Sequence, residues 1–145
     1  MRTISIGACI LTIVASAPAA AQQAQSLPHF SCTTLAHRHA VPENPNLQFR
    51  VLKLTFEPGY VASQNMHRHK YGEIVYLLSG SGADQTIDGK KTPLTSTKAL
   101  FIPPTEVHTI VPTGNTPVSV ISVQFTDAKA PAFTAVSKVP AVCKD

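Results

Sequence analysis

The stretch MHRHKYGEIVYLLSG, residues 66–80, determines how the rest of the chain is interpreted. Side chains alternate between the two faces of an extended strand, so His67 and His69 share one face. Glu73 has the same parity and joins them if the strand resumes past Gly72. The apolar run at residues 74–78 follows directly and predicts a buried strand. Two imidazoles and one carboxylate form a donor set that holds a divalent transition metal while leaving coordination positions open.

A second segment, residues 100–108, supplies a fourth candidate ligand. Its short apolar strand ends at Pro103-Pro104, and two prolines cannot continue a sheet ladder. The chain is therefore expected to turn before His108 begins the next strand.

The first of these segments resembles the first sequence motif of the cupin superfamily, G(X)5HXH(X)3,4E(X)6G. The residues His67, His69, Glu73 and Gly80 are all in register with it. The opening glycine of the motif is displaced, because Gly59 lies two residues earlier than the pattern requires.

The second segment resembles the second motif, G(X)5PXG(X)2H(X)3N, less closely. Pro103 and His108 have the required separation, but Thr97 and Thr105 replace the two glycines and Pro112 replaces the asparagine. The resemblance spans about half of the chain, from Gly59 to Pro112. Because glycine is usually selected where φ must be positive, the missing glycines make the turn geometry at both threonines a question for the structure.

The resemblance implies an all-β, single-domain jelly-roll β-barrel of the cupin type, with a metal inside it. The ligands implied are His67, His69, Glu73 and His108. Nitrogen and oxygen donors without a thiolate suit several divalent transition metals. Family analogy favours Mn or Fe, with Zn, Ni, Co and Cu as alternatives.

Strand signals along the chain favour the same architecture independently. The chain has 145 residues, which suits one domain. About eight short strands are expected, with turn signals every 8–12 residues. Residues 47–56 predict a strand with Leu52, Leu54 and Phe56 on one face and Arg50 at its less buried start. Asp88-Gly89 predicts a two-residue hairpin.

The N-terminus has the features of a cleavable signal peptide. Arg2 is followed by a charge-free apolar run, and Ala19-Ala20-Ala21 provides the small residues that a signal peptidase reads. A retained anchor is disfavoured because the run is shorter than the roughly 20 residues of a spanning helix. A lipoprotein signal at Cys9 is disfavoured because the apolar region follows that cysteine. The expected organisation is therefore a signal peptide (1–21), an N-terminal arm (22–45), the barrel (46–126) and a tail (127–145).

Export leaves two of the three cysteines, Cys32 and Cys143. An even number in an oxidising compartment, the periplasm or the outside of the cell, favours a disulfide between them. Such a bridge closes a loop of about 110 residues, worth about 4–5 kcal/mol in the chain-entropy model. The alternative is two unpaired thiols, one near each end.

Charge and composition exclude two classes of partner. Removing Arg2 with the signal lowers the formal net charge from +4 to +3, and no basic run is longer than Lys90-Lys91. Neither a nucleic-acid surface nor a polybasic membrane anchor is therefore expected. The expected partner is a small organic molecule, and a homodimer is left open.

A second His-Arg-His triplet, at residues 37–39, could be mistaken for the ligand strand. No glutamate follows it at the cupin spacing, since Glu43 lies in a proline-rich loop. The triplet is therefore interpreted as solvated surface.

Two functions of different class follow from these residues. The first is a metal-dependent enzyme, a dioxygenase or related oxidoreductase, with lyase or isomerase chemistry as variants; Glu73 is then both ligand and catalytic base. The second is a non-catalytic barrel that binds or senses a metal or small ligand. The cupin fold hosts both kinds of protein, so fold alone does not choose between them.

Overall fold

The computed structural model describes residues 27–128, 134–136 and 143. The proposed signal peptide lies outside the described residues. The elements, in chain order, are β1 (Phe30–Val41), β2 (Asn44–Phe56), the 3₁₀ turn η1 (Ala62–Asn65), β3 (His67–Arg68), β4 (Glu73–Ser79), β5 (Ala83–Ile87), β6 (Lys90–Pro93), β7 (Leu100–Ile102), β8 (His108–Pro112), β9 (Val118–Asp127) and β10 (Thr134–Ala135). No helix in these ranges has the length and apolar character needed to cross a membrane.

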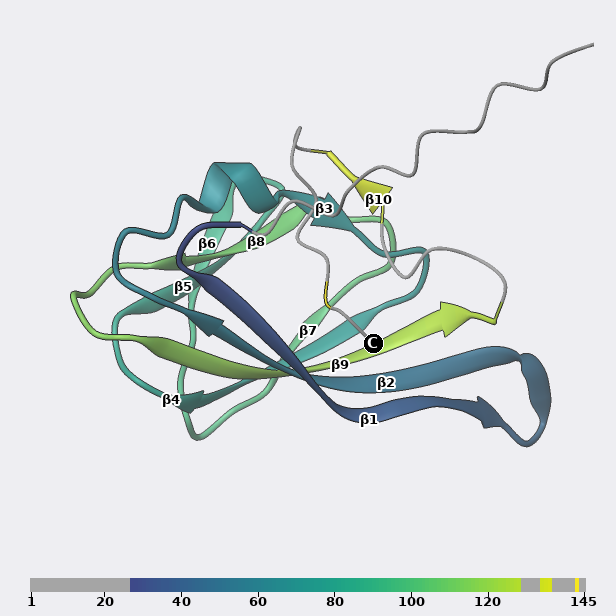
Figure 1. The fold of residues 1–145 in the computed structure, drawn as a ribbon. Coiled ribbons are helices and arrows are strands. Elements are labelled where there is room, and N and C mark those ends of the chain that lie inside the picture. The colour runs from purple at the N-terminus through teal and green to yellow at the C-terminus, as the bar shows by residue number, and fades with distance from the viewer. Residues whose placement is uncertain (1–26, 129–133, 137–142, 144–145) are drawn as a thin grey trace, which may run out of the picture.

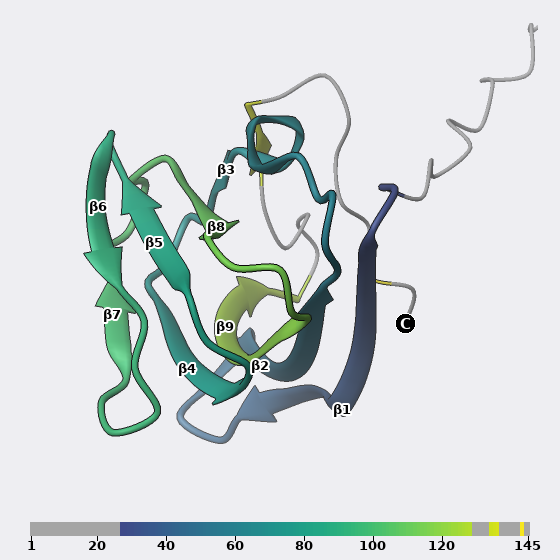
Figure 2. The same cartoon turned by 90° about the vertical axis from the view of Figure 1, so that its left-hand side faces the viewer.

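The strands form two five-stranded antiparallel sheets that face each other (Figures 1 and 2). One sheet has the order β1-β2-β9-β4-β7 and the other the order β10-β3-β8-β5-β6. Apart from the consecutive pairs β1-β2 and β5-β6, neighbours in each sheet come from distant parts of the chain, as in a jelly roll. The all-β fold expected from the sequence is confirmed.

Strand alternation places the apolar core between the sheets. Leu52, Leu54 and Phe56 are all buried on the inner face of β2, as expected. Phe56 and Leu54 pair with Val118 and Val120 of β9 across the ladder. The expectation for Arg50 was wrong, because it is only 4% exposed and continues the same inward row. Arg50 is buried because β2 is paired on both sides there, with β1 and with β9.

The Asp88-Gly89 hairpin joins β5 and β6 as expected. Both residues have positive φ, 44° and 82°, which is the backbone of the type I′ turn that fits strand twist.

The segment expected to be an N-terminal arm contributes a strand of the barrel. Residues Phe30–Val41 form β1, which pairs with β2 along the sheet edge through several bulges. Polar residues and an irregular register hide its period in the sequence. The side chains of the second His-Arg-His triplet, within β1, lie outside the described residues.

The two ends of the chain are tied to the barrel. Cys32 of β1 and Cys143 form a disulfide with their Cα atoms 5.2 Å apart, compatible with the expected bridge. The short strand β10 in the tail pairs with β3. The Cys143 end of the tail therefore reaches the part of the barrel that carries His67.

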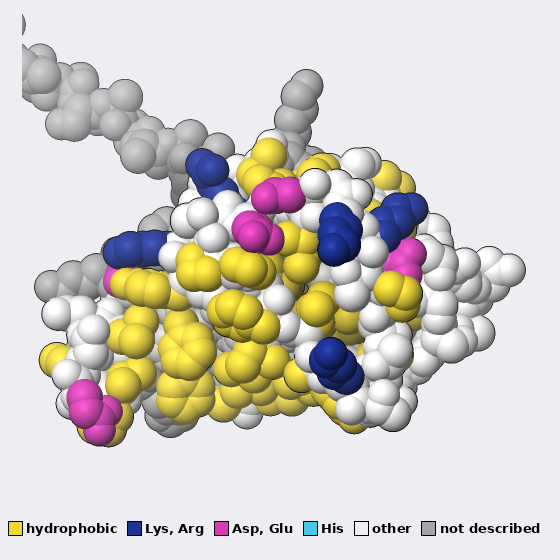
Figure 3. Space-filling view, turned by 180° about the vertical axis from the view of Figure 1, so that it is seen from behind, with side chains coloured by type: hydrophobic (Ala, Val, Ile, Leu, Met, Phe, Trp, Pro, Cys, Tyr) yellow, Lys and Arg dark blue, Asp and Glu magenta, His cyan; other side chains and the backbone are white. Residues whose placement is uncertain are grey.

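Hydrophobic side chains also gather on an outer face of the molecule (Figure 3). The outward-pointing side chains of β4 are apolar, and Ile74, Tyr76 and Leu78 are exposed. Ile74 pairs with Phe101 of the edge strand β7. Phe101 is the most exposed large apolar side chain of the described residues. Tyr76 faces away from the ligands, as its parity predicts.

One of the two threonines that replace motif glycines carries backbone strain. Thr105 has φ of 67°, a left-handed conformation that β-branched residues rarely adopt, whereas Thr97 does not have a positive φ. The Thr105 amide donates a hydrogen bond of 2.8 Å to the carbonyl of His69. The missing glycine therefore matters at one position only, and there the turn supports a ligand residue.

Thr105→Gly should raise the stability of the metal-free protein. Relief of left-handed strain outweighs the added freedom of glycine in the unfolded chain, for a net gain of about 0.5–1 kcal/mol. Thermal unfolding in the presence of a chelator should show a Tm increase of about 2–5 °C. Thr97→Gly is the matched control and should lower the Tm or leave it unchanged. A lower Tm for Thr105→Gly would contradict this account of the turn.

Candidate metal centre

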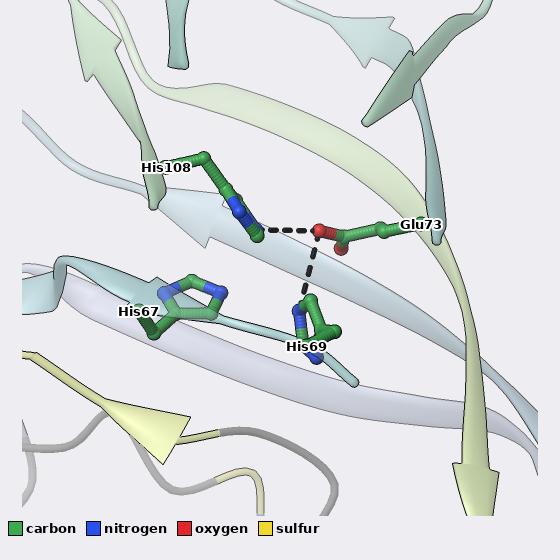
Figure 4. Close-up of side chains that lie close together, drawn as sticks. All are labelled: His67, His69, Glu73 and His108. Atoms are coloured by element: carbon green, nitrogen blue, oxygen red, sulfur yellow. Dashed lines mark ion pairs between the residues drawn. The ribbon is translucent and has the colours of Figure 1, made fainter. Parts of the chain in front are cut away.

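The structure brings together the four residues that the sequence indicated. His67, His69, Glu73 and His108 each offer a ligand atom, and these atoms lie within 4.8 Å of one another. Their side chains point toward a common centre (Figure 4). His29, which is also described, is not part of this group.

The ligands come from both sheets. His67 of β3 and His108 of β8 are directly paired across the ladder. Glu73 begins β4 in the facing sheet, where it pairs with Gln124. A strand does resume directly past Gly72, but it lies in the facing sheet, because the chain leaves β3 after Arg68 and crosses over. Gly72 allows this crossing, because a Cβ there would collide with the Phe101 ring.

Backbone carbonyls orient two of the imidazoles. Nδ1 of His67 lies 2.9 Å from the carbonyl oxygen of Asn65, and Nδ1 of His108 lies 2.9 Å from that of Glu106. A carbonyl can only accept, so Nδ1 carries the proton in each neutral ring. Nε2 then presents a lone pair to the centre, which is the usual arrangement of metal-binding histidines.

The Glu73 carboxylate is held on both of its oxygens. Oε2 lies 2.9 Å from Nε2 of His108 and 3.3 Å from Nε2 of His69. Oε1 accepts hydrogen bonds from the Ser122 hydroxyl and, at 3.1 Å, from Nε2 of Gln124. Gln124 in turn accepts from Nε of Arg50 at 2.9 Å. The carboxylate is thus oriented with one oxygen toward the imidazoles.

Burial and neighbouring charge shift the ionisation of the group in the metal-free protein. Burial raises the pKa of Glu73, but hydrogen bonds to His108 and His69 outweigh this and leave the pKa well below its usual range. Burial lowers the pKa of His67 to about 4, with repulsion from His108 acting in the same direction. For His108, Glu73 outweighs burial and raises the pKa. Glu73 is therefore ionised and His67 neutral, while the Glu73 carboxylate favours the protonated form of His108.

A small cavity adjoins the group. Its volume is about 20 Å³, and its polar side is lined by Asn65, His67, Glu73, Gln85, His108 and Thr109. The apolar wall is formed by Leu54, Phe56, Val75 and Ile110. A second cavity of about 30 Å³ shares His67 and Leu54 with the first, and Arg50 and Cys143 line its wall. One or two water-sized groups fit in the first cavity.

Sequence reasoning missed the polar residues around the ligands. Ser122 and Gln124 share the inward parity of Val118 and Val120 in β9. Polar residues at buried parity, at the end of a strand that is otherwise apolar inside, are the signal that could have revealed them.

The residues present fit a divalent transition metal. Three imidazole nitrogens and one ionised carboxylate are converging donors, and three of the four residues are buried. Two imidazoles oriented by backbone carbonyls and a carboxylate held in place can together bind a cation.

Substitution of a ligand should remove the metal. His108→Ala removes one of the four ligand side chains. At limiting metal, the metal content per folded chain should therefore fall to about a tenth or less of the wild-type value. His37→Ala, in the other His-Arg-His triplet, should keep the wild-type content. Plasma emission spectrometry of the purified proteins measures both, and the reverse pattern would show that the other triplet is the ligand strand.

Metal affinity should depend on pH through His108. This imidazole must lose its proton to bind, so below its raised pKa the affinity falls by about tenfold or more per pH unit. His67, with its pKa of about 4, contributes no competing proton above about pH 5. Competition with a chelator for Zn²⁺ between pH 5.5 and 8 should therefore show an affinity that rises with pH and levels off at higher pH. An affinity that does not change over this range would contradict the role of His108.

Comparison with known proteins agrees with this geometry. The cupin domain family matches residues 52–124, which include all four ligand candidates. A mannose-1-phosphate guanylyltransferase of Klebsiella pneumoniae is 34% identical over 77 residues, which cover 53% of this chain and 16% of that protein. The alginate biosynthesis protein AlgA of Pseudomonas aeruginosa is 35% identical over 77 residues, again 16% of its length. The chain thus spans about a sixth of these relatives.

Two solved structures show the same fold. A cupin 2 domain-containing protein from Halorhodospira halophila has a TM-score of 0.56 at 21% identity, covering 81% of this chain and 77% of that chain. The DMSP lyase DddQ from Ruegeria pomeroyi has a TM-score of 0.55 at 18% identity, covering 74% of this chain and 52% of that chain. The family match over half the sequence and the two-sheet barrel together show that this chain belongs to the cupin superfamily.

Proposed function

We propose that this protein is an exported, metal-dependent enzyme that acts on a small organic molecule. The reaction class that we favour is a dioxygenase or related oxidoreductase, with lyase or isomerase chemistry as variants. The observation that carries the proposal is the buried convergence of three imidazoles and one carboxylate within 4.8 Å. Mn or Fe is the metal proposed, with Zn, Ni, Co and Cu as alternatives.

Each ligand has a distinct part in this proposal. His67, His69 and His108 would hold the ion through their imidazoles, and Glu73 would supply the one negative charge among the ligands. A divalent metal held there would polarise an oxygen of the substrate as a Lewis acid. Ser122 and Gln124 keep Glu73 directed at the centre, so that little reorganisation is needed on binding.

The cavity restricts the substrate. Leu54, Phe56, Val75 and Ile110 give it an apolar wall opposite the ligands. Such a wall excludes water and favours a substrate with apolar carbon next to its metal-binding group. A polymer or a phosphate ester fits this interior poorly. The shared fold with a lyase, DddQ, is in keeping with the lyase variant.

The second candidate function is a non-catalytic protein that binds or senses a metal or small ligand. The size of the cavity favours it, because a cavity of about 20 Å³ holds an ion with few additional groups. If the Mn- and Fe-loaded proteins consume no oxygen and convert no phenolic, carboxylic or sugar substrate, this function becomes the better supported one.

Glu73→Gln should separate metal binding from turnover. The amide oxygen still coordinates weakly, so with metal in excess the occupancy should stay near that of the wild type. The amide cannot accept a proton, so turnover should fall about 10²- to 10⁴-fold, as for loss of a general base. Metal analysis and turnover of the same sample measure the two effects.

Glu57→Gln is the matched control, because the Glu57 side chain is exposed and is not part of the ligand group. It should leave both metal and turnover unchanged. Parallel loss of metal and activity in Glu73→Gln would show that Glu73 is a ligand and that the base is another group.

We also propose export to the periplasm or the medium, on the strength of the charge-free apolar run and the Ala19-Ala20-Ala21 site. The mature chain should begin near Gln22. Intact mass of the protein from the periplasmic fraction checks this, and full-length protein in the membrane fraction would contradict it.

A further inference from the structure

Gln85, on β5, has a polar atom that the fold leaves without a partner. Its side chain is fully buried and lines the cavity beside Glu73, His67 and His108. Nε2 donates a hydrogen bond of 3.1 Å to the carbonyl of Thr109. Oε1 is also buried, yet it has no hydrogen-bond partner among the described residues. An acceptor with no donor is costly in a protein interior and calls for an explanation.

The orientation of the Gln85 amide is determined by its neighbour. Rotating the amide by half a turn would place Oε1 against the Thr109 carbonyl, so that two acceptors would meet. The carbonyl of Thr109 therefore keeps Nε2 on its own side. Oε1 is the end of the amide that remains for another group.

No donor of the described residues is bonded to Oε1. The Thr109 hydroxyl donates to the carbonyl of Ala62, and Nδ1 of His108 is bonded to the carbonyl of Glu106. The ionised carboxylate of Glu73 can only accept. A molecule that enters the cavity can supply the missing donor, because Gln85 lines this cavity.

We propose that Gln85 accepts a hydrogen bond from a hydroxyl group of the ligand, and that the cavity thereby selects small hydroxyl-bearing molecules. This assignment rests on the proposed metal centre and names the substrate class for it. A ligand would bind the metal through one group and present its hydroxyl proton to Oε1 of Gln85. An analogue that carries a methyl group in place of the hydroxyl leaves the buried acceptor unpaired and is rejected.

Glycolate and propionate are a matched pair of probes. Both have one carboxylate and the same number of heavy atoms, but propionate has a methyl group where glycolate has its hydroxyl. Titration of each into the Co²⁺-loaded protein, followed by the visible absorption of the ion, gives the two affinities. The ratio of glycolate affinity to propionate affinity should be about tenfold lower in Gln85→Met than in the wild type. This variant keeps the side-chain length but removes the acceptor.

Comparing ratios cancels the stronger chelation of any Co²⁺ ion by glycolate, because that preference is common to both proteins. Thr86→Val is the matched control. Thr86 neighbours Gln85 on β5 and also has a buried oxygen without a partner, but alternation turns it away from the cavity. Its ratio should equal that of the wild type. Gln85→Leu is a second variant for the case in which Gln85→Met does not fold.

A measurement on the wild type alone is independent of any variant. Methoxyacetate has the glycolate oxygen without its proton. The ratio of glycolate affinity to methoxyacetate affinity should therefore be about tenfold higher for the Co²⁺-loaded protein than for aqueous Co²⁺. Equal preferences, or an unchanged ratio in Gln85→Met with cobalt bound, would overturn the role of Gln85 and leave the metal centre intact. Failure of the wild type to bind cobalt would overturn the metal centre and this proposal together.

Discussion

The buried carboxylate of Glu73 is the constraint on which the rest of the site depends. A carboxylate that is 3% exposed has lost most of its hydration, which costs several kcal/mol unless other groups replace the water. The protein replaces it with Ser122 and Gln124 on one oxygen and two imidazoles on the other. Without a metal, the proton on His108 completes the compensation, and a metal ion would take the place of that proton.

Sheet register delivers these donors. Arg50 of β2 pairs with Gln124 of β9, and Gln124 pairs with Glu73 of β4, so the hydrogen-bonded chain is one cross-strand row. A slip of one residue in β9 would turn Gln124 to the outer face and bring an apolar side chain inward. The apolar pairs farther along the same strands, such as Phe56 with Val118, oppose that slip. Core packing and site geometry are thus set by the same register.

The centre also needs both sheets at a fixed separation. Glu73 belongs to one sheet, while His67 and His108 pair within the other. The turn at Thr105 accepts a left-handed backbone to hold the His69 carbonyl between them. Strain retained beside a ligand is consistent with a position that is constrained by its surroundings. The disulfide adds a further restraint, because Cys143 lines the cavity that His67 and Arg50 share.

Much of the fold and the ligand set could be predicted from the sequence, because both depend on local pattern. A few neighbouring residues are enough to predict the ligand spacing and the Asp88-Gly89 turn. The same holds for the alternation of Leu52, Leu54 and Phe56. What could not be predicted depends on pairing between distant segments. The burial of Arg50, the crossing of the chain at Gly72 and the strand character of β1 all follow from neighbours far along the chain. The unpartnered oxygen of Gln85 likewise exists only in three dimensions.

The central claim is that three imidazoles and one carboxylate hold a single ion between the two sheets. X-ray absorption spectroscopy of the metal-loaded mature protein at the metal edge tests it most directly. The account predicts a first shell of nitrogen and oxygen only, with the multiple scattering of three imidazoles. A sulfur ligand, or one imidazole or none, would contradict it.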